Sequence, residues 1–145
     1  MTQFEKILYT AKTRTSGGRD GTSRSSDGSL DVRLSAPGSK LGGTNPEQLF
    51  ATGWSACFLS ALKEVAGKMK VTLPPDLAID AEVDLGINGD AYGLAVRLSV
   101  YLRDVAPDVA RRLVDDAQEI CAYSRATRDN VDPVINVIST RTPKA

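Results

Sequence analysis

The chain has 145 residues, of which 41% are hydrophobic, 25% charged and 6% aromatic, and its 18 basic and 18 acidic residues give a formal net charge of zero. This composition is ordinary for a globular protein, and the length suits a single domain over residues 1–145. A neutral chain with few aromatic side chains is a poor candidate for binding nucleic acid or an anionic membrane.

Two cysteines and the complete absence of His restrict the chemistry further. Without His, the chain can form no Cys-His or Ser-His-Asp site and has no His metal ligand. The absence of a Cys-x-x-Cys motif excludes a thioredoxin motif and a zinc ribbon. The first ten residues, MTQFEKILYT, lack a signal-peptide pattern, and no stretch approaches the roughly 20 apolar residues of a membrane helix. We therefore expect a cytoplasmic protein with reduced thiols.

The N-terminal third predicts a three-stranded meander. Residues 6–14 form the first expected strand, followed by a glycine-rich turn at 16–21. A hairpin turn at residues 26–29 joins the second expected strand, Thr22–Ser25, to the third, at 30–34.

A long helix should follow a Gly/Pro loop. The sequence Asn45-Pro46-Glu47 supplies a capping side chain, a proline at the first position and an acid in the first turn, and the helix should end near Lys68. Residues 49–62 are apolar almost all round, which predicts burial on most sides. A chain of this length encloses such a helix more easily as a dimer.

The remaining sequence predicts a long hairpin. Apolar residues alternate with polar ones over residues 77–87 and again over 94–102, with a tight turn at Asn88-Gly89-Asp90 between them.

A second helix should open at Pro107 and carry Cys121 on its apolar stripe. A final strand at 131–139 should lie at a sheet edge because it contains Pro133. Residues 140–145 are expected to be a loose tail. The element order β-β-β-α-β-β-α-β defines an α+β fold.

Each cysteine has an inert and a reactive interpretation. Cys57 and Cys121 both lie on apolar faces of expected helices, where a thiol is commonly a small core residue. A permanent Cys57–Cys121 bridge is disfavoured in a reducing compartment, and a reactive thiol with a resolving thiol is the alternative. A buried thiol needs a nearby cation to lower its pKa, and without His that cation must be arginine.

Arg19 and Glu47 are the charged candidates. Arg19 lies in a glycine-rich turn, where it is either a solvated turn residue or a guanidinium that polarises a thiol and a peroxide. Glu47 either stabilises the helix start or orients Arg19. Ten residues separate Glu47 from Cys57, or about 15 Å along a straight helix. A kink at Gly53 or the approach of another segment would be needed to bring them together.

Four motifs together resemble the organic hydroperoxide resistance branch of the Ohr/OsmC family. They are GGRDG at residues 17–21, TNPEQLF at 44–50, SACF at 55–58 and CAYS at 121–124. The resemblance covers nearly the whole chain. It implies an OsmC-like fold, with an intertwined homodimer whose long central helices are enclosed by antiparallel sheets.

The resemblance also implies a function, a thiol-dependent peroxidase that reduces alkyl and fatty-acid hydroperoxides to alcohols. Cys57 would be the peroxidatic cysteine, Cys121 the resolving cysteine, and Glu47 would orient Arg19 over the thiolate. The family uses no metal or other cofactor and takes its electrons from the dihydrolipoyl groups of a lipoylated protein.

An apolar surrounding of the thiol would favour organic peroxides, since a buried methylene contributes about 0.8 kcal/mol. The expected members of this surrounding are Leu49, Phe50, Trp54, Phe58 and Ile120. Three alternatives remain open at this point: a broader OsmC-type peroxidase, a non-enzymatic thiol redox sensor, and a dimer with two inert core thiols.

Overall fold

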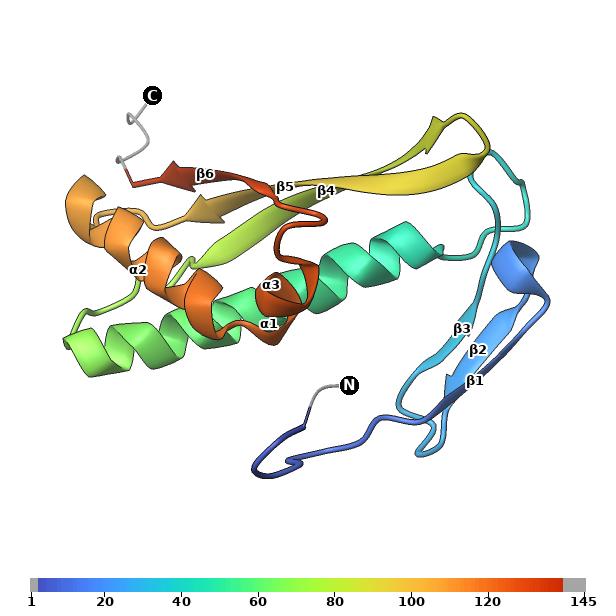
Figure 1. The fold of residues 1–145 in the computed structure, drawn as a ribbon, viewed down its shortest axis with the longest axis horizontal. Helices are drawn as coiled ribbons and strands as arrows, with labels where there is room; N and C mark the ends of the chain where they lie inside the picture. Colours follow the sequence, from blue (N-terminus) through green and yellow to red (C-terminus); the bar gives the residue numbers. More distant parts are fainter. Residues whose placement is uncertain (1–2, 140–145) are drawn as a thin grey trace. The chain divides into compact units, whose positions relative to one another are not determined.

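The computed structural model describes residues 3–139. The chain divides into two compact units, Met1–Pro46 and Glu47–Ala145 (Figure 1). The single domain over residues 1–145 stays a prediction, and the predicted tail at 140–145 lies outside the described residues.

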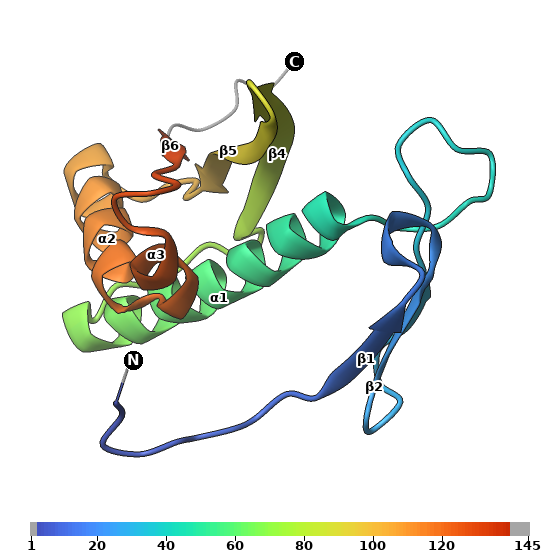
Figure 2. The same cartoon turned by 45° about the vertical axis from the view of Figure 1, so that its right-hand side comes forward.

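The first unit is a small antiparallel sheet in the order β1-β2-β3, which confirms the predicted meander. Figure 2 shows β1 and β2 of this sheet side by side. Its elements are β1 Thr13–Ser16, the 3-10 helix η1 Gly18–Asp20, β2 Thr22–Ser25 and β3 Asp31–Arg33. The first strand was predicted wrongly at residues 6–14. Only the four residues of β1 pair with a neighbouring strand, because β2 is itself only four residues long. Residues 6–12 are exposed and belong to no strand.

Asp27 organises the predicted hairpin turn between β2 and β3. Its Oδ1 accepts hydrogen bonds from the hydroxyl groups of Ser25 and Ser29, both at 2.7 Å, and from the backbone N–H of Ser29 at 3.0 Å. These donors stabilise the carboxylate and lower the pKa of Asp27 to about 2.

We expect the change Asp27→Asn to remove part of the acid sensitivity of folding. The unfolded carboxyl titrates near pH 3.9, so its native hydrogen bonds contribute stability above about pH 4 that is lost as the pH falls toward 2. Denaturant unfolding at neutral pH and at pH 3 should show a smaller pH-dependent loss for Asp27→Asn than for the parent chain. Asp90→Asn, in the turn between β4 and β5, is the control, and an equal loss in all three proteins would contradict the expectation.

The second unit places helices on one face of a three-stranded sheet (Figure 1). Its elements are α1 Pro46–Met69, β4 Ala78–Asn88, β5 Ala91–Tyr101, α2 Pro107–Ile120, α3 Ala122–Thr127 and β6 Val134–Ile138. The sheet order β4-β5-β6 confirms both the long hairpin and the edge position of the last strand. β6 runs parallel to β5, so the sheet is mixed and not purely antiparallel. The α2–α3 segment supplies the crossover that parallel pairing requires.

The core lies between this sheet and the helices. Apolar side chains of β5 alternate toward the helices, and the intervening Arg97 faces the opposite side, where it forms an ion pair with Asp84 at 2.8 Å. Fully buried side chains of α1, β5 and α2 meet there: Trp54, Phe58, Leu62, Leu98, Val100, Leu113 and Val114. The alternation of apolar and polar residues along the hairpin therefore corresponds to a sheet with one apolar and one charged face.

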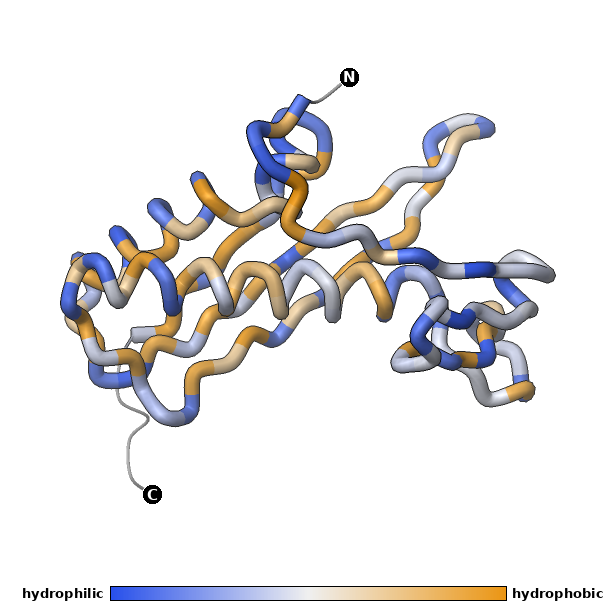
Figure 3. Tube along the Cα trace, turned by 90° about the horizontal axis from the view of Figure 1, so that it is seen from below, coloured by the Kyte–Doolittle hydropathy of each residue, from blue (hydrophilic) through white to orange (hydrophobic). Residues whose placement is uncertain are grey.

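The predicted long helix is confirmed, with its end at Met69. Apolar residues recur along its trace (Figure 3). Within the chain, however, α1 buries one face and leaves Thr52, Ala56 and Ser60 exposed. The small residues on that exposed face account for its apolar appearance in the sequence. Among the described residues, no helix has the length and apolar character needed to span a membrane.

Candidate functional site

The two cysteines meet in the second unit. Cys57 lies in the middle of α1, and Cys121 lies between α2 and α3. Their Sγ atoms are 3.2 Å apart, with the Cys121 thiol donating toward Cys57. Both cysteines are free. A disulfide is about 2.05 Å long, so the two sulfurs need to approach by only about 1.1 Å to bond.

Cys121 occupies a break between two helices, and its prediction within the second helix was wrong. α2 ends at Ile120, Cys121 has extended backbone angles of φ −68° and ψ 123°, and α3 begins at Ala122. No proline or glycine marks this break in the sequence. Buried contacts on both sides of it, from Cys121 to Cys57 and from Ser124 to Trp54, outweigh the local helix propensity.

The two thiols differ in exposure. Cys121 is 1% exposed, whereas Cys57 is only partly buried. Burial raises the pKa of Cys121, the nearby polar groups of Ser124 partly oppose the increase, and the neighbouring Cys57 adds to it. The more accessible cysteine, Cys57, is therefore the better placed of the two to meet a reactant first.

Aromatic side chains surround the thiol-bearing segments. The rings of Phe50 and Trp54 meet edge to face, with centroids 5.6 Å apart, and Phe50 also contacts Tyr123 at 6.4 Å. The indole Nε1 of Trp54 donates a hydrogen bond to Ser124 Oγ at 3.1 Å. Sequence reasoning did not single out Tyr123 or Ser124 as separate candidates, although both belong to the CAYS motif.

Gly53 provides the space for Tyr123. A Cβ atom at this position would lie 2.7 Å from the Tyr123 hydroxyl oxygen and 3.1 Å from its Cζ atom. α1 continues through Gly53 as a regular α-helix, so this glycine does not mark the kink that the sequence allowed. Its role is to let the ring that follows Cys121 approach the helix that carries Cys57.

We expect Gly53→Ala to destabilise the protein by about 1–3 kcal/mol, because the new methyl group overpacks the contact with Tyr123. Gly67→Ala is the matched control: it lies in the same helix, and a Cβ there would have no neighbour within 4 Å. That control should be stabilising by roughly 0.5–1 kcal/mol, the ordinary preference of a helix for alanine. Denaturant unfolding of both variants measures the difference, and equal effects would show that Tyr123 adjusts freely.

Glu47 lies far from Cys57 along the same helix. It stands in the first turn of α1, which is unbroken between the two residues, so about 15 Å separates them along the axis. One carboxylate oxygen, Oε1, is buried. Any meeting of Glu47 with the thiols therefore requires another residue to span the gap.

Arg19 belongs to η1 in the first unit. Gly17 and Gly18 precede it with φ values of +76° and +62°, in the left-handed region that favours glycine. Asp20 Oδ1 accepts a hydrogen bond from the Ala36 N–H at 3.0 Å, which ties the turn to the following loop. The turn thus has a defined conformation, and the role of Arg19 toward the thiols stays a prediction.

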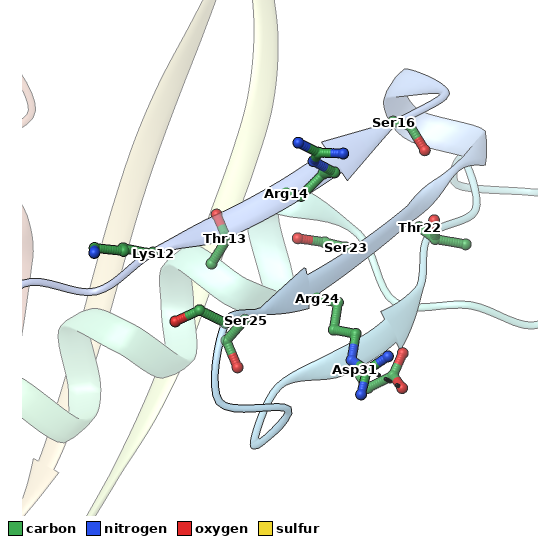
Figure 4. A pocket seen from close by; sticks show the side chains of 10 residues that line it. Lys12, Thr13, Arg14, Ser16, Thr22, Ser23, Arg24, Ser25 and Asp31 are labelled. Atoms are coloured by element: carbon green, nitrogen blue, oxygen red, sulfur yellow. Dashed lines mark ion pairs between the residues drawn. The ribbon is translucent and has the colours of Figure 1, made fainter.

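A hollow of about 670 Å³, lined by residues of polar type, lies over the first unit (Figure 4). Lys12, Arg14 and Arg24 line it together with serine and threonine hydroxyls, and Arg24 Nε lies 4.0 Å from Asp31 Oδ2. None of the four predicted site residues lines this hollow. In residues 3–139, no group of three or more acidic residues and cysteines is arranged to hold a metal ion.

Comparison with known proteins places this chain in a family. The model of the OsmC-like protein family matches residues 37–136. The organic hydroperoxide resistance protein of Xanthomonas axonopodis pv. citri is 42% identical over 141 residues, covering 94% of this chain and 99% of that protein. OhrB of Bacillus subtilis, an organic hydroperoxide resistance protein, is 42% identical over 130 residues, covering 86% of this chain and 94% of that protein.

Solved structures agree with the sequence relatives. The crystal structure of OhrB from Bacillus subtilis has a TM-score of 0.84 and 39% identity, covering 90% of this chain and 99% of that chain. An organic hydroperoxide resistance protein from Legionella pneumophila has a TM-score of 0.85 and 39% identity, with coverages of 92% and 99%. The fold is that of the OsmC-like proteins. The chain belongs to the OsmC/Ohr family, and its relatives named above are organic hydroperoxide resistance proteins.

Proposed function

We propose that this protein is a thiol-dependent peroxidase that reduces organic hydroperoxides to alcohols. The observation that carries the proposal is the separation of 3.2 Å between the sulfurs of Cys57 and Cys121, with Cys57 partly exposed and Cys121 buried. The names of the relatives, organic hydroperoxide resistance proteins, supply the substrate class.

Cys57 performs the first step. Its thiolate attacks the terminal oxygen of the hydroperoxide, the O–O bond breaks, and the departing alkoxide takes up a proton to become the alcohol. Cys57 is thereby oxidised to a sulfenic acid. The thiolate is the nucleophile in this chemistry, so a cation that favours it accelerates the step.

Cys121 performs the second step. Its sulfur attacks the sulfur of the sulfenic acid, an S–S bond forms, the S–O bond breaks and water leaves. An external dithiol then reduces the Cys57–Cys121 disulfide and is itself oxidised. We propose a dihydrolipoyl group on a lipoylated protein as that dithiol, with no metal or other cofactor in the cycle and the cytoplasm as the compartment.

Arg19 and Glu47 support the first step in this proposal. The guanidinium of Arg19 stabilises the Cys57 thiolate and polarises the peroxide, while Glu47 orients Arg19. A planar guanidinium can donate hydrogen bonds to a thiolate and to an oxygen at the same time. The glycine-rich turn that carries Arg19 and the partly buried carboxylate of Glu47 are compatible with these roles.

A homodimer is part of the proposal. Four apolar side chains near the N-terminus are more than two thirds exposed in the single chain: Phe4, Ile7, Leu8 and Tyr9. A run of exposed apolar residues of this kind favours an interface. We propose that a second copy of the chain covers them in the intertwined dimer. Sedimentation at several concentrations tests this, and a monomer throughout would refute it.

Apolar side chains near the thiols favour organic substrates over hydrogen peroxide. Phe50, Cys57 and Leu59 are partly buried against the apolar core, and the ring of Phe50 packs on both Trp54 and Tyr123. In such surroundings, each methylene group of the substrate that is transferred out of water contributes about 0.8 kcal/mol to binding. Hydrogen peroxide has no methylene to bury.

The test adds one equivalent of tert-butyl hydroperoxide, or of hydrogen peroxide, to the fully reduced protein, followed by thiol counting and mass analysis. The proposal expects rapid loss of both thiols, one intramolecular disulfide and a clear preference for the organic peroxide. Turnover with dihydrolipoamide then separates an enzyme from a redox sensor, which would be oxidised once without sustained reduction of peroxide. Survival of both thiols would overturn the proposal, and equal rates with the two peroxides would indicate a broader OsmC-type peroxidase.

A further inference from the structure

We propose that the hydroxyl group of Tyr123 is the proton donor of the first step, and that it protonates the inner oxygen of the hydroperoxide as the O–O bond breaks. The inference rests on the peroxidase chemistry proposed above and names a catalytic residue for a proton that this chemistry requires. It arises from the contact between Tyr123 and Gly53, which brings a phenol group to the helix that carries Cys57.

The ring of Tyr123 lies against one face of α1. Its hydroxyl oxygen is 2.7 Å, and its Cζ atom 3.1 Å, from the position that a Cβ atom of Gly53 would occupy. The ring of Phe50, three residues before Gly53 on the helix, contacts the Tyr123 ring with centroids 6.4 Å apart. A glycine inside a helix costs about 0.5–1 kcal/mol relative to alanine, and here that cost permits the close approach of the phenol group.

The same face of α1 carries Cys57. Cys57 follows Gly53 by four residues, a spacing that places two Cβ atoms about 5–6 Å apart on one side of a helix. Helical side chains lean toward the N-terminus of the helix, so the side chain of Cys57 leans toward the turn of Gly53. The two separations together place the Tyr123 hydroxyl oxygen within about 9 Å of the Cys57 Cβ atom.

A hydroperoxide group fits into a gap of this size. The sulfur attacks the outer oxygen from about 3–3.5 Å, and a donor to the inner oxygen stands about 2.6–3.2 Å away. A reactant can also reach both residues, since Cys57 is partly exposed and Tyr123 is 39% exposed. The thiol and the phenol can therefore contact the two oxygens of one hydroperoxide.

The phenol group has a proton to donate. In the described part of the chain, Thr127 Oγ1 donates a hydrogen bond to the backbone carbonyl of Tyr123 at 2.7 Å, and no hydrogen bond occupies the phenol group. Its O–H is thus available to a bound molecule. The chain contains no His, the most common general acid, and tyrosine is one of the residues that can act in its place.

The proposed step balances without a further reactant. The Cys57 thiolate forms a bond to the outer oxygen, the O–O bond breaks, and the inner oxygen leaves with the electron pair. The phenol proton moves to that oxygen, which gives the alcohol and a phenolate. An alkoxide is a stronger base than a phenolate, so the transfer favours the alcohol, and the phenolate then takes up a proton from water. General acid catalysis of this kind accelerates a step by roughly 10²–10⁴-fold.

The test compares two peroxides that differ in the leaving group. The first, tert-butyl hydroperoxide, releases an alkoxide that needs a proton, whereas peracetic acid releases acetate, which leaves without one. Tyr123→Phe keeps the ring and removes the hydroxyl group. In single-turnover measurements, oxidation of the Cys57 thiol should become roughly a hundredfold slower with tert-butyl hydroperoxide and stay nearly unchanged with peracetic acid.

A structural role of Tyr123 would not produce this difference, because a misplaced Cys57 attacks both peroxides more slowly. Tyr92→Phe is the matched control: it removes the hydroxyl group of a tyrosine in β5 that is 75% exposed, and it should leave both reactions unchanged. Gly53→Ala is a second variant. Its methyl group would displace the Tyr123 hydroxyl, so it should slow the reaction with tert-butyl hydroperoxide selectively, including where Tyr123→Phe fails to fold.

Two results would overturn the inference: equal slowing of the two reactions, or no slowing of either. Either result counts in folded Tyr123→Phe or, where that variant does not fold, in Gly53→Ala. Failure of the proposed function is a separate observation, because the thiols of the parent protein would then survive tert-butyl hydroperoxide.

Discussion

Replacing Cys57 with serine is expected to reduce hydroperoxide consumption to the uncatalysed rate. A serine hydroxyl is not ionised near neutral pH and cannot pass through a sulfenic acid, so neither step of the proposed cycle can begin. The exchange changes one atom in a partly buried position of α1, and the fold should therefore persist. Consumption of tert-butyl hydroperoxide in the presence of dihydrolipoamide measures the loss.

Cys121→Ser is the matched control for this result. It removes the second thiol while leaving Cys57 able to react, so one equivalent of peroxide should still be reduced and a species heavier by one oxygen should accumulate. Residual turnover in Cys57→Ser equal to that of the parent protein would assign the chemistry to another group.

Replacing Phe58 with alanine is expected to destabilise the protein by about 3–5 kcal/mol. The side chain is 0% exposed and lies in the cluster where α1 meets the sheet and α2. Truncation removes its buried surface and leaves a cavity among side chains that can collapse only partly. Denaturant unfolding at fixed protein concentration measures the change, because a dimer would make the apparent stability depend on concentration.

Phe58→Leu is the control for volume. It preserves an apolar side chain of similar size and should lower the stability by less than about 1.5 kcal/mol. A loss below about 1 kcal/mol in Phe58→Ala would place the ring outside the packed core, against its complete burial in the structure.

Local patterns in the sequence were sufficient for the elements that depend on local chemistry. The residues Asn45-Pro46 mark the start of α1 because capping and proline geometry act within one turn. The alternation over residues 77–102 identifies β4 and β5 because one face of their sheet is apolar and the other charged. The prediction of a strand at residues 6–14 was wrong because a strand extends only where a neighbouring strand pairs with it. The neighbour, β2, is only four residues long.

The candidate site depends on contacts that no local pattern encodes. Cys57 and Cys121 lie 64 residues apart, so the sequence allowed their pairing as one alternative but could not establish it. The break at Cys121 has no glycine or proline, so it could not be read from propensity. The sequence suggested Gly53 only as a place where the long helix could kink, whereas the structure shows that this position leaves space for the ring of Tyr123, from a distant segment. Ser124 became visible only with its bond to Trp54.

The position of Cys121, at the break between α2 and α3, also determines how much a disulfide to Cys57 would restrict the unfolded chain. A disulfide from Cys57 to Cys121 would close a loop that contains the whole β4–β5 hairpin and all of α2. In the loop-entropy model, closing roughly 65 residues restricts the unfolded chain by about 4 kcal/mol. Reduction by the proposed external dithiol would release that restriction. The oxidised protein should therefore melt at a higher temperature and resist proteolysis longer, so that its position in the proposed cycle can be followed by global unfolding without any chemical label.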